Sequence, residues 1–210
     1  MGSPATSTAR SYGGKTAAER TAERRERLIE ATINVLAEAG EGRATMTAIC
    51  SGAGLTERYF YESFANLDEA MVAAFDHVCS EILTLAAQVI ENTPGTPEQR
   101  VHAVMETFVE MVVTSPSKGK VAVMHTSANP ELRGRRNDLM AVFSDFVARE
   151  ADELYGERTW PAERARVFGV VYIAGFAELI SAWLNGDVAQ SPAELVDTAS
   201  DLFTALFRRV

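Results

Sequence analysis

The sequence predicts an all-α protein with two domains, and three observations support this. Apolar residues recur at helical spacing along the chain, and no segment shows a convincing period of two. Proline repeatedly follows Thr, Ser or Asn, as it does at the first position of helices. The chain is 47% hydrophobic, which is enough for a real core. We expect about nine helices, with no sequence repeat.

The N-terminal third contains the clearest helix signals. Residues 1–15 are rich in Gly, Ser and Thr, which predicts a disordered arm. Thr16 and Glu19 have the spacing of a capping box, so the first helix begins there and ends at Gly40. We expect residues 16–66 to form a small three-helix domain and residues 67–210 a larger helical one.

Residues 45–64 have the pattern of two short helices joined by a tight glycine turn. Thr45 and Thr56 are suited to cap the two helices, and Gly54 supplies the positive φ of the turn. Phe60 and Phe64 lie one turn apart, so both face inward. This is the layout of a helix-turn-helix, whose second helix lies in the DNA major groove.

The outward face of the second helix carries the candidate DNA contacts. At about 100° per residue, Arg58 and Glu62 point away from the core, with Tyr59 and Tyr61 beside them. Arg58 has the chemistry to bind guanine, while Glu62 either accepts from cytosine or orients Arg58. A plain helical hairpin with an Arg58–Glu62 surface pair is the alternative.

The remaining helices are predicted from their start signals. Asn66 begins a long helix that reaches about Asn92 and connects the small domain to the rest of the chain. Each further helix is announced by a proline at its start. The five starts are Thr96-Pro97, Ser115-Pro116, Asn129-Pro130, Trp160-Pro161 and Ser191-Pro192.

Charge is distributed unevenly between the two parts. Residues 1–64 carry eight basic and eight acidic side chains, whereas residues 65–210 carry twelve and twenty-one. The whole excess of −9 therefore lies outside the predicted DNA-binding domain. The two cysteines fit a reducing compartment, and we recognise neither a signal peptide nor a membrane span, so we expect a cytoplasmic protein without a membrane partner.

Large, pliable side chains in the second part predict an adaptable apolar cavity for a small molecule, although a plain core is the alternative for each of them. Two polar residues are candidate anchors: His125, or else a structural histidine, and Glu178, or else an interface residue. The candidate ligand-binding residues are Met105, Phe108, Met111, Met124, His125, Phe143, Phe146, Tyr172, Phe176 and Glu178.

Enzyme motifs are missing from the sequence. There is no HExxH, CxxC, P-loop or GxSxG pattern, and the three histidines are far apart in the sequence. We therefore expect no catalysis, no metal and no cofactor. Two other hypotheses stay open: an α-helical ligand-binding or enzymatic protein with a non-functional helix-turn-helix, and a DNA-binding protein whose second domain only dimerises.

From Arg24 to about Val78 the chain resembles the tetracycline-repressor (TetR) family of transcriptional regulators. The resemblance rests on RRERLIEATINVLAEAG and ATMTAICSGAGLTERYFYESFANLDEAMVAAF, and the ending AWLNGDVAQSPAELVDTASDLF is similar to the last two helices of that family. It implies a homodimer formed through those two helices. It also implies binding to a palindromic DNA operator, which is released when a small-molecule effector enters the second domain.

The resemblance also assigns roles to single positions. It implies that Thr45 and Thr56 bind phosphates, that Tyr61 touches the DNA backbone and that Glu62 faces the groove. The leading positions of the recognition helix are Glu57, Arg58 and Tyr59. Leu67 stands where many members have a phosphate-binding Lys, and Glu57 stands where a basic residue is common. Both departures predict fewer phosphate contacts and a weaker salt dependence.

Overall fold

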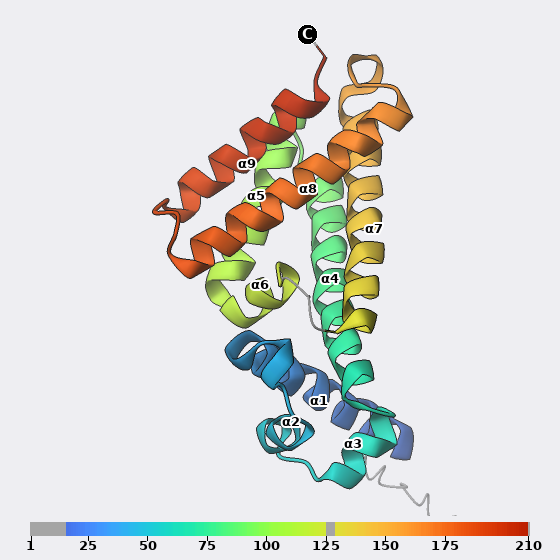
Figure 1. The fold of residues 1–210 in the computed structure, drawn as a ribbon. Coiled ribbons are helices and arrows are strands. Elements are labelled where there is room, and N and C mark those ends of the chain that lie inside the picture. Colours follow the sequence, from blue (N-terminus) through green and yellow to red (C-terminus); the bar gives the residue numbers. More distant parts are fainter. Residues whose placement is uncertain (1–15, 125–128, 210) are drawn as a thin grey trace, which may run out of the picture.

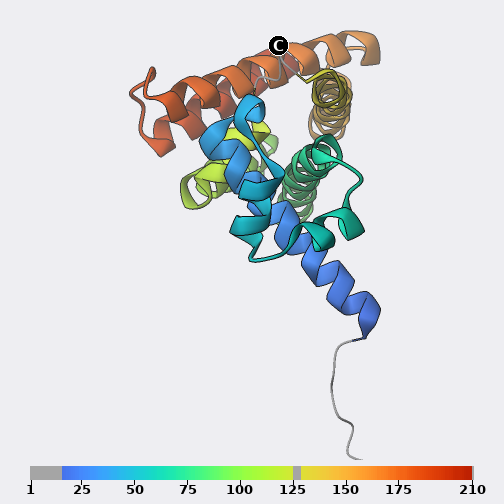
Figure 2. The same ribbon diagram turned by 60° about the horizontal axis from the view of Figure 1, so that its bottom comes forward.

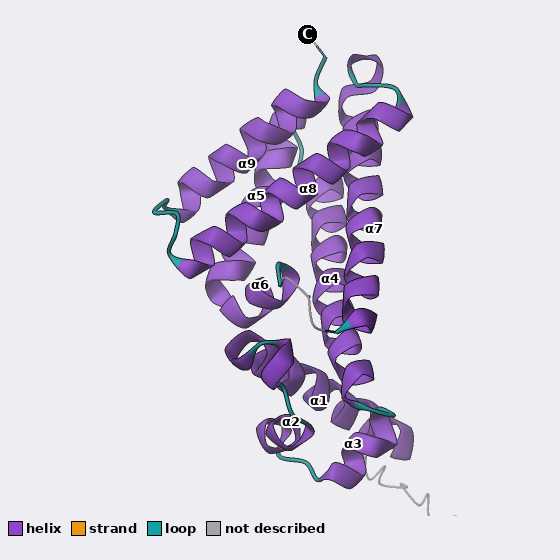
Figure 3. Cartoon of the chain, viewed as in Figure 1, coloured by secondary structure: helices purple, strands orange, loops and turns teal. Residues whose placement is uncertain are grey.

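The structure, a computed structural model, describes residues 16–124 and 129–209. These residues form nine α-helices and two short 3₁₀ turns, with no strand between residues 16 and 124 or 129 and 209 (Figure 3). The predicted all-α class is therefore confirmed. The helices are α1 (Ala17–Ala39), α2 (Met46–Ala53), α3 (Glu57–Ser63), α4 (Leu67–Asn92), α5 (Pro97–Thr114), α6 (Pro116–Ala122), α7 (Pro130–Tyr155), α8 (Ala162–Asn185) and α9 (Pro192–Phe207). The arm predicted over residues 1–15 lies outside the described residues.

The molecule has a small head and a larger body. Helices α1 to α3 form the head at one end, and α4 runs from the head into the body beside α7 (Figure 1). Figure 2 views α4 and α7 nearly along their axes, with α8 and α9 crossing to one side. The short helix α6 packs against α1, α4 and α5, so it lies where head and body meet.

The predicted helix starts depend on short-range hydrogen bonds. Reciprocal capping boxes join Thr16 to Glu19, Thr96 to Gln99 and Ser191 to Glu194, and proline is the first residue of α5, α6, α7 and α9. Helix α8 differs, because Pro161 is its extended N-cap residue rather than its first helical one. The indole of the preceding Trp160 donates to the Leu206 carbonyl at 2.9 Å, which fixes this entry against α9.

The apolar core of the head continues into the body along α4. Leu28, Ile49 and Phe60 are fully buried in it, together with α4 residues from Ala70 to Cys79. Burial of each such large side chain contributes about 1.5–3 kcal/mol. Leu132 of α7 belongs to the same cluster. Because packing does not break between residues 66 and 67, the domain boundary placed there stays a prediction.

Two helices, α4 and α8, are long and apolar enough to cross a membrane by length and composition alone. Helix α4 packs against α1, α5, α6 and α7, as expected of the central helix of a bundle. Helix α8 packs on α7 and α9 but leaves one apolar face uncovered.

Candidate DNA-binding surface and ligand cavity

The turn between α2 and α3 is built as the sequence predicts. Gly54 has φ 61° and ψ 38°, a left-handed conformation that strains any side chain, and its N–H is directed at the carbonyls of Cys50 and Ser51. The Arg27 guanidinium of α1 donates to the Ala53 carbonyl, one residue before the glycine. The turn is therefore fastened both by its own backbone and by α1.

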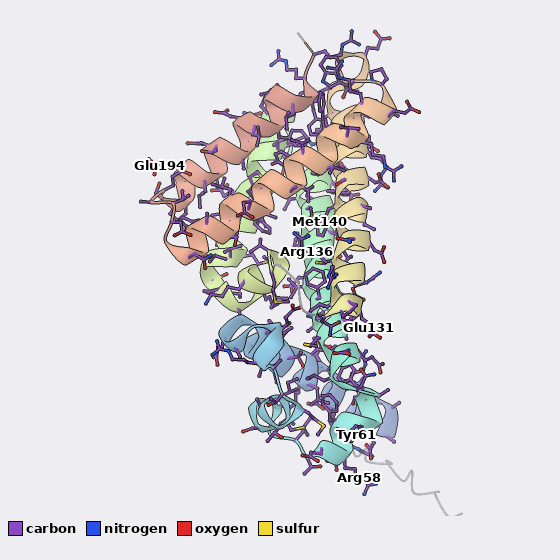
Figure 4. All side chains as sticks on the ribbon, viewed as in Figure 1. Arg58, Tyr61, Glu131, Arg136, Met140 and Glu194 are labelled. Atoms are coloured by element: carbon purple, nitrogen blue, oxygen red, sulfur yellow. The ribbon has the colours of Figure 1, made fainter. Side chains whose placement is uncertain are left out.

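Two buried rings set the orientation of α3. Phe60 and Phe64 are 5.7 Å apart between ring centroids and are almost fully buried, so the opposite side of the helix faces outward. Arg58 lies on that side, with 83% of its side chain exposed. Figure 4 shows Arg58 and Tyr61 at the end of the molecule farthest from the body. Both side chains are thus presented to a partner.

Glu62 is held between two arginines. Arg58 Nε donates to Glu62 Oε1 at 3.1 Å, and Arg24 Nη2 of α1 lies 3.7 Å from Glu62 Oε2. The Arg24 guanidinium also lies 4.6 Å from the centroid of the Tyr59 ring, a cation–π contact. Because the Glu62 carboxylate is already shared, this arrangement favours its orienting role over direct reading of a base. Tyr59 is half-buried beneath Arg24 and has less freedom to meet DNA than Tyr61 has.

The predicted phosphate contacts are exposed at helix starts. The Thr45 hydroxyl accepts from the Ala48 N–H at 3.2 Å and keeps its own hydrogen to donate. The Thr56 hydroxyl makes no capping bond, so it is available to a phosphate. Tyr61 is 60% exposed, and Glu57 is exposed in the first turn of α3.

Leu67, the first residue of α4, has a structural reason to be apolar. Its half-buried side chain packs against the core of the head. A neighbouring side chain binds the backbone at the start of this helix instead, because Asn66 Oδ1 accepts from the Glu69 N–H at 2.8 Å. Leu67 therefore contributes packing at the start of α4.

A cavity of about 120 Å³ lies in the body, between α4, α5, α7 and α8, with the end of α6 at one side. Most of the predicted ligand residues line it. They are Met105, Phe108, Met111, Phe143, Phe146, Tyr172 and Phe176. The cluster of pliable side chains thus surrounds a void rather than only filling a core.

Three predicted ligand residues are not part of this wall. Met124 packs against the core of the head instead, because it follows α6 at the junction of head and body. Glu178 is exposed on α8, and the cavity wall does not include it. The positions of α8 that line the cavity are Tyr172, Ile173, Phe176 and Ala177. His125 lies outside the described residues.

Sequence reasoning missed the α4 side of the cavity and its charged residue. Phe75, Cys79 and Ile82 line it from α4, while Arg136 and Met140 line it from α7. The sequence predicts this segment only as part of the long connecting helix. Arg136 sits in the polar run RGRRND, which resembles a solvated surface.

The two titratable groups in the cavity wall other than Arg136 are uncharged near neutral pH. Burial raises the pKa of the Cys79 thiol to about 12, with a smaller contribution from Asp76. Burial also raises the pKa of the Tyr172 phenol, whose hydroxyl lies 3.2 Å from both the Ala199 carbonyl and Met105 Sδ. Neither group is a thiolate or phenolate nucleophile, so the wall is suited to hold an apolar molecule.

One group of described residues has the spacing of metal ligands. Ligand atoms of Glu26, Glu30 and His77 lie within 4.8 Å of one another, on α1 and α4. His77 Nε2 is 3.8 Å and 3.7 Å from the two carboxylates, which are ion-pair distances. Nearby, Lys118 Nζ of α6 lies 2.6 Å from Glu81. These contacts link the head to the body, and exposed acidic groups of this kind are common without a metal.

The uncovered apolar face of α8 is formed by three exposed valines in the first half of the helix. Val167, Val170 and Val171 are 60%, 50% and 55% exposed, at the i, i+3, i+4 spacing of one helix face. Leu202 of α9 is 40% exposed. Exposed apolar stripes of this length are typical of interaction surfaces.

Head, long connecting helix and hollow helical body together define the fold of one-component regulators of the tetracycline-repressor type. The fatty acid degradation regulator FadR of Bacillus halodurans shares it with a TM-score of 0.75 and 16% identity, over 93% of this chain and 100% of that one. FadR of Bacillus subtilis, in complex with stearoyl-CoA, has a TM-score of 0.69 and 17% identity, over 85% and 96%. A TetR-like regulator of Rhodococcus sp. RHA1 has a TM-score of 0.66 and 15% identity, over 92% and 96%.

These similarities confirm the predicted resemblance at the level of the fold. No family model matches the sequence, and no curated protein matches it. At such low identity the function has to be argued from the sites themselves.

Proposed function

We propose that this chain is a cytoplasmic, homodimeric transcriptional regulator that binds a palindromic DNA operator. In its simplest form it is a repressor, released when a small, largely apolar effector enters the body. The observation that carries the proposal is the outward face of α3. There Arg58 is exposed and oriented by Glu62, with the free hydroxyl of Thr56 beside it. A recognition helix needs the same kinds of residue, namely one side chain that reads a base and neighbours that contact phosphates.

Dimerisation through α8 and α9 is supported by the uncovered apolar face of α8. Val167, Val170 and Val171 lie in one stripe, and a second copy related by twofold symmetry would cover it. Glu178 follows Val171 by seven residues and lies on the same side, which suits the alternative role of an interface residue. A dimer also places two recognition helices one DNA turn apart, about 34–36 Å, or a multiple of it.

The cavity supports an apolar effector. Its wall is nearly all aliphatic, aromatic and thioether side chains, which adapt to flexible molecules. The structural neighbour from B. subtilis holds stearoyl-CoA. A long-chain acyl compound is therefore the effector class we favour for this chain.

Helix α4 provides a physical route from effector to DNA. Phe75 and Cys79 belong to the core of the head and also line the cavity, as does Leu139 of α7. A ligand that displaces these side chains shifts α4 and, with it, the position of α3. Coupling of this kind typically amounts to about 1–3 kcal/mol and is reciprocal.

The other two hypotheses are less well supported. A body that only dimerises has no need of the void between α4, α5, α7 and α8. An enzymatic or ligand-binding protein with a non-functional helix-turn-helix leaves the Arg24–Glu62–Arg58 arrangement without a use. Each of the favoured features is explained by a regulator.

Selection of bound duplexes from a random pool tests the proposal. We expect a palindromic consensus, and an affinity for it that falls as salt rises. A dimer that neutralises about six phosphates gives a slope of about −5 in log K against log salt, and we expect a shallower slope here because of Leu67 and Glu57.

Substitution of Thr56 by Ala should weaken binding to all duplexes alike. Substitution of the exposed α7 residue Arg149 should not. A pool that yields no consensus would refute DNA-sequence recognition.

A further inference from the structure

One charged side chain lines the cavity. Arg136 of α7 is half-buried in its wall, and the other described lining residues are apolar except for Cys79, Thr107 and Tyr172. Figure 4 shows Arg136 and Met140 on the α7 side of the body, with Arg136 nearer the head. A cation in such a wall determines which ligands the cavity accepts.

Arg136 has no counter-ion in the described part of the chain. Its neighbour Arg135 donates from Nε to Asp76 Oδ1 of α4 at 2.5 Å, whereas no carboxylate described here lies within ion-pair distance of Arg136. A half-buried guanidinium with five donors is costly to leave without a partner. An anion that enters the cavity would satisfy it.

The cavity is long and slender. On α4 its wall runs from Phe75 to Ala86, and on α7 from Arg136 to Val147. At 1.5 Å per residue each of these stretches spans about 16 Å. A volume of about 120 Å³ spread over this length suits an unbranched chain. An extended chain of roughly a dozen carbons covers the same distance.

We propose that the effector is an anionic amphiphile whose aliphatic chain lies along α4 and α7 and whose anionic group binds Arg136. The proposal rests on the ligand-binding part of the proposed function and names the chemistry of that ligand. The anion is either the carboxylate of a free fatty acid or a phosphate of an acyl thioester carrier. The fatty acid carries its charge directly at the end of the apolar chain, whereas the thioester carries it beyond the polar pantetheine arm.

The position of Arg136 gives the anion a role beyond affinity. Arg136 lines the end of the cavity that also contains Phe75, which belongs to the core of the head. The adjacent Arg135–Asp76 ion pair joins α7 to α4. The charged end of the ligand therefore lies nearest the head, and the chain fills the distal part of the cavity. An uncharged chain of equal length would bind without reaching the same contacts.

Calorimetric binding of three probes of equal chain length tests this, with DNA absent. Dodecanoate, dodecanol and dodecanoyl-coenzyme A are titrated, below their aggregation limits, into the wild type, Arg136→Met and Arg149→Met. Met is apolar and of similar length, and Arg149 is an exposed arginine of the same helix that the cavity wall does not include. We expect the wild type and Arg149→Met to bind at least one anionic probe at least tenfold more tightly than dodecanol. Arg136→Met should bind both classes alike, at a stoichiometry of one per chain.

The conservative variant Arg136→Lys keeps the charge and should retain most of the preference, which separates an anion site from a role in packing. Preference for dodecanoate alone identifies the carboxylate, and preference for the thioester identifies the phosphates. The proposal is overturned if Arg136→Met keeps the preference of the wild type, or if the wild type shows none. Since DNA takes no part, failure here leaves operator binding intact, and loss of operator binding leaves this result unaffected.

Discussion

The arginines of the head and the arginine of the cavity are in opposite situations. In the head, Arg24 lies over Tyr59, Arg25 lies 4.7 Å from the Phe64 ring centroid, and Arg27 caps α2. Arg136 has none of these contacts in the described residues. The head is prearranged by its own side chains, whereas the cavity leaves a cation for a ligand. Rigid presentation suits a fixed DNA groove, and an unsatisfied group suits a molecule that comes and goes.

Packing shows the same contrast. The head buries Phe60 and Leu28 completely, while the body surrounds its cavity with methionine and phenylalanine. A close-packed region is sensitive to the loss of a few atoms, because surrounding side chains relax only partly. A hollow region tolerates such changes better. Four experiments, each with its own variants, compare the head with the body.

The largest expected effect is on the core of the head. Phe60→Ala should reduce the free energy of unfolding by about 3–5 kcal/mol, since it removes a fully buried ring. Tyr61→Ala, one residue away and mostly exposed, should change it by less than about 0.5 kcal/mol. Urea denaturation followed by circular dichroism measures both. Equal losses of unfolding free energy for the two variants would mean that Phe60 does not lie on the buried side of α3 and Tyr61 on the exposed side.

The next effect concerns the body surface. Val171→Asp introduces a charge into the apolar stripe of α8, and twofold symmetry would place it in the interface twice. We expect a dimer for the wild type and a monomer for the variant at micromolar concentration, by size exclusion with light scattering. The exposed substitution Val113→Asp on α5 is the matched control and should remain dimeric. A wild type that is monomeric contradicts the assembly directly.

A smaller effect is expected for base reading. Arg58→Ala should lose about 1–3 kcal/mol of discrimination at one base pair in each half-site, because a bidentate contact to guanine is removed. Glu62→Gln should weaken discrimination less, since it only loosens the 3.1 Å contact that orients Arg58. Competition between consensus and single-mismatch duplexes measures this. If Arg58→Ala keeps the sequence preference of the wild type, another residue reads the base.

The smallest effect is the pH dependence that Cys79 contributes. Its pKa is raised from 9.0 to about 12 in the folded protein, so its contribution to stability is complete below pH 9 and is lost as the pH rises toward 12. Between pH 8 and pH 10 the wild type should lose about 1.4 kcal/mol on this account. Cys79→Ala should show a correspondingly smaller decline in urea midpoints over this range. Identical declines would mean that the thiol is accessible to water.

The contrast between head and body also explains what the sequence could predict. The head is specified by neighbours in the chain: Thr45 and Asn66 cap helices three residues ahead, and Gly54 forms the turn. Phe60 and Phe64 follow from helix period alone. Such signals need no knowledge of distant segments, so the position of α3 was foreseen.

The cavity depends on segments far apart in the sequence. Phe75 and Phe143 carry the same apolar signal, and only the packing of α4 beside α7 shows that both border a void. Arg136 stands among polar residues that face solvent, and its inward direction follows from the register of α7. Glu178 shows the converse, because a charge within an apolar run suggested a cavity contact, whereas the residue is exposed on α8 and lies outside the cavity wall. Periodicity gives the faces of a helix but not which face meets a cavity.

Reciprocal coupling between DNA and effector is the decisive test of α4 as the link between head and cavity. The affinity of the dimer for its selected duplex is measured with and without saturating effector, and the affinity for effector with and without saturating duplex. We predict that effector weakens DNA binding about 5- to 150-fold and that DNA weakens effector binding by the same factor. A protein that binds both partners with affinities unaffected by each other would contradict the account of α4 as the link between head and cavity.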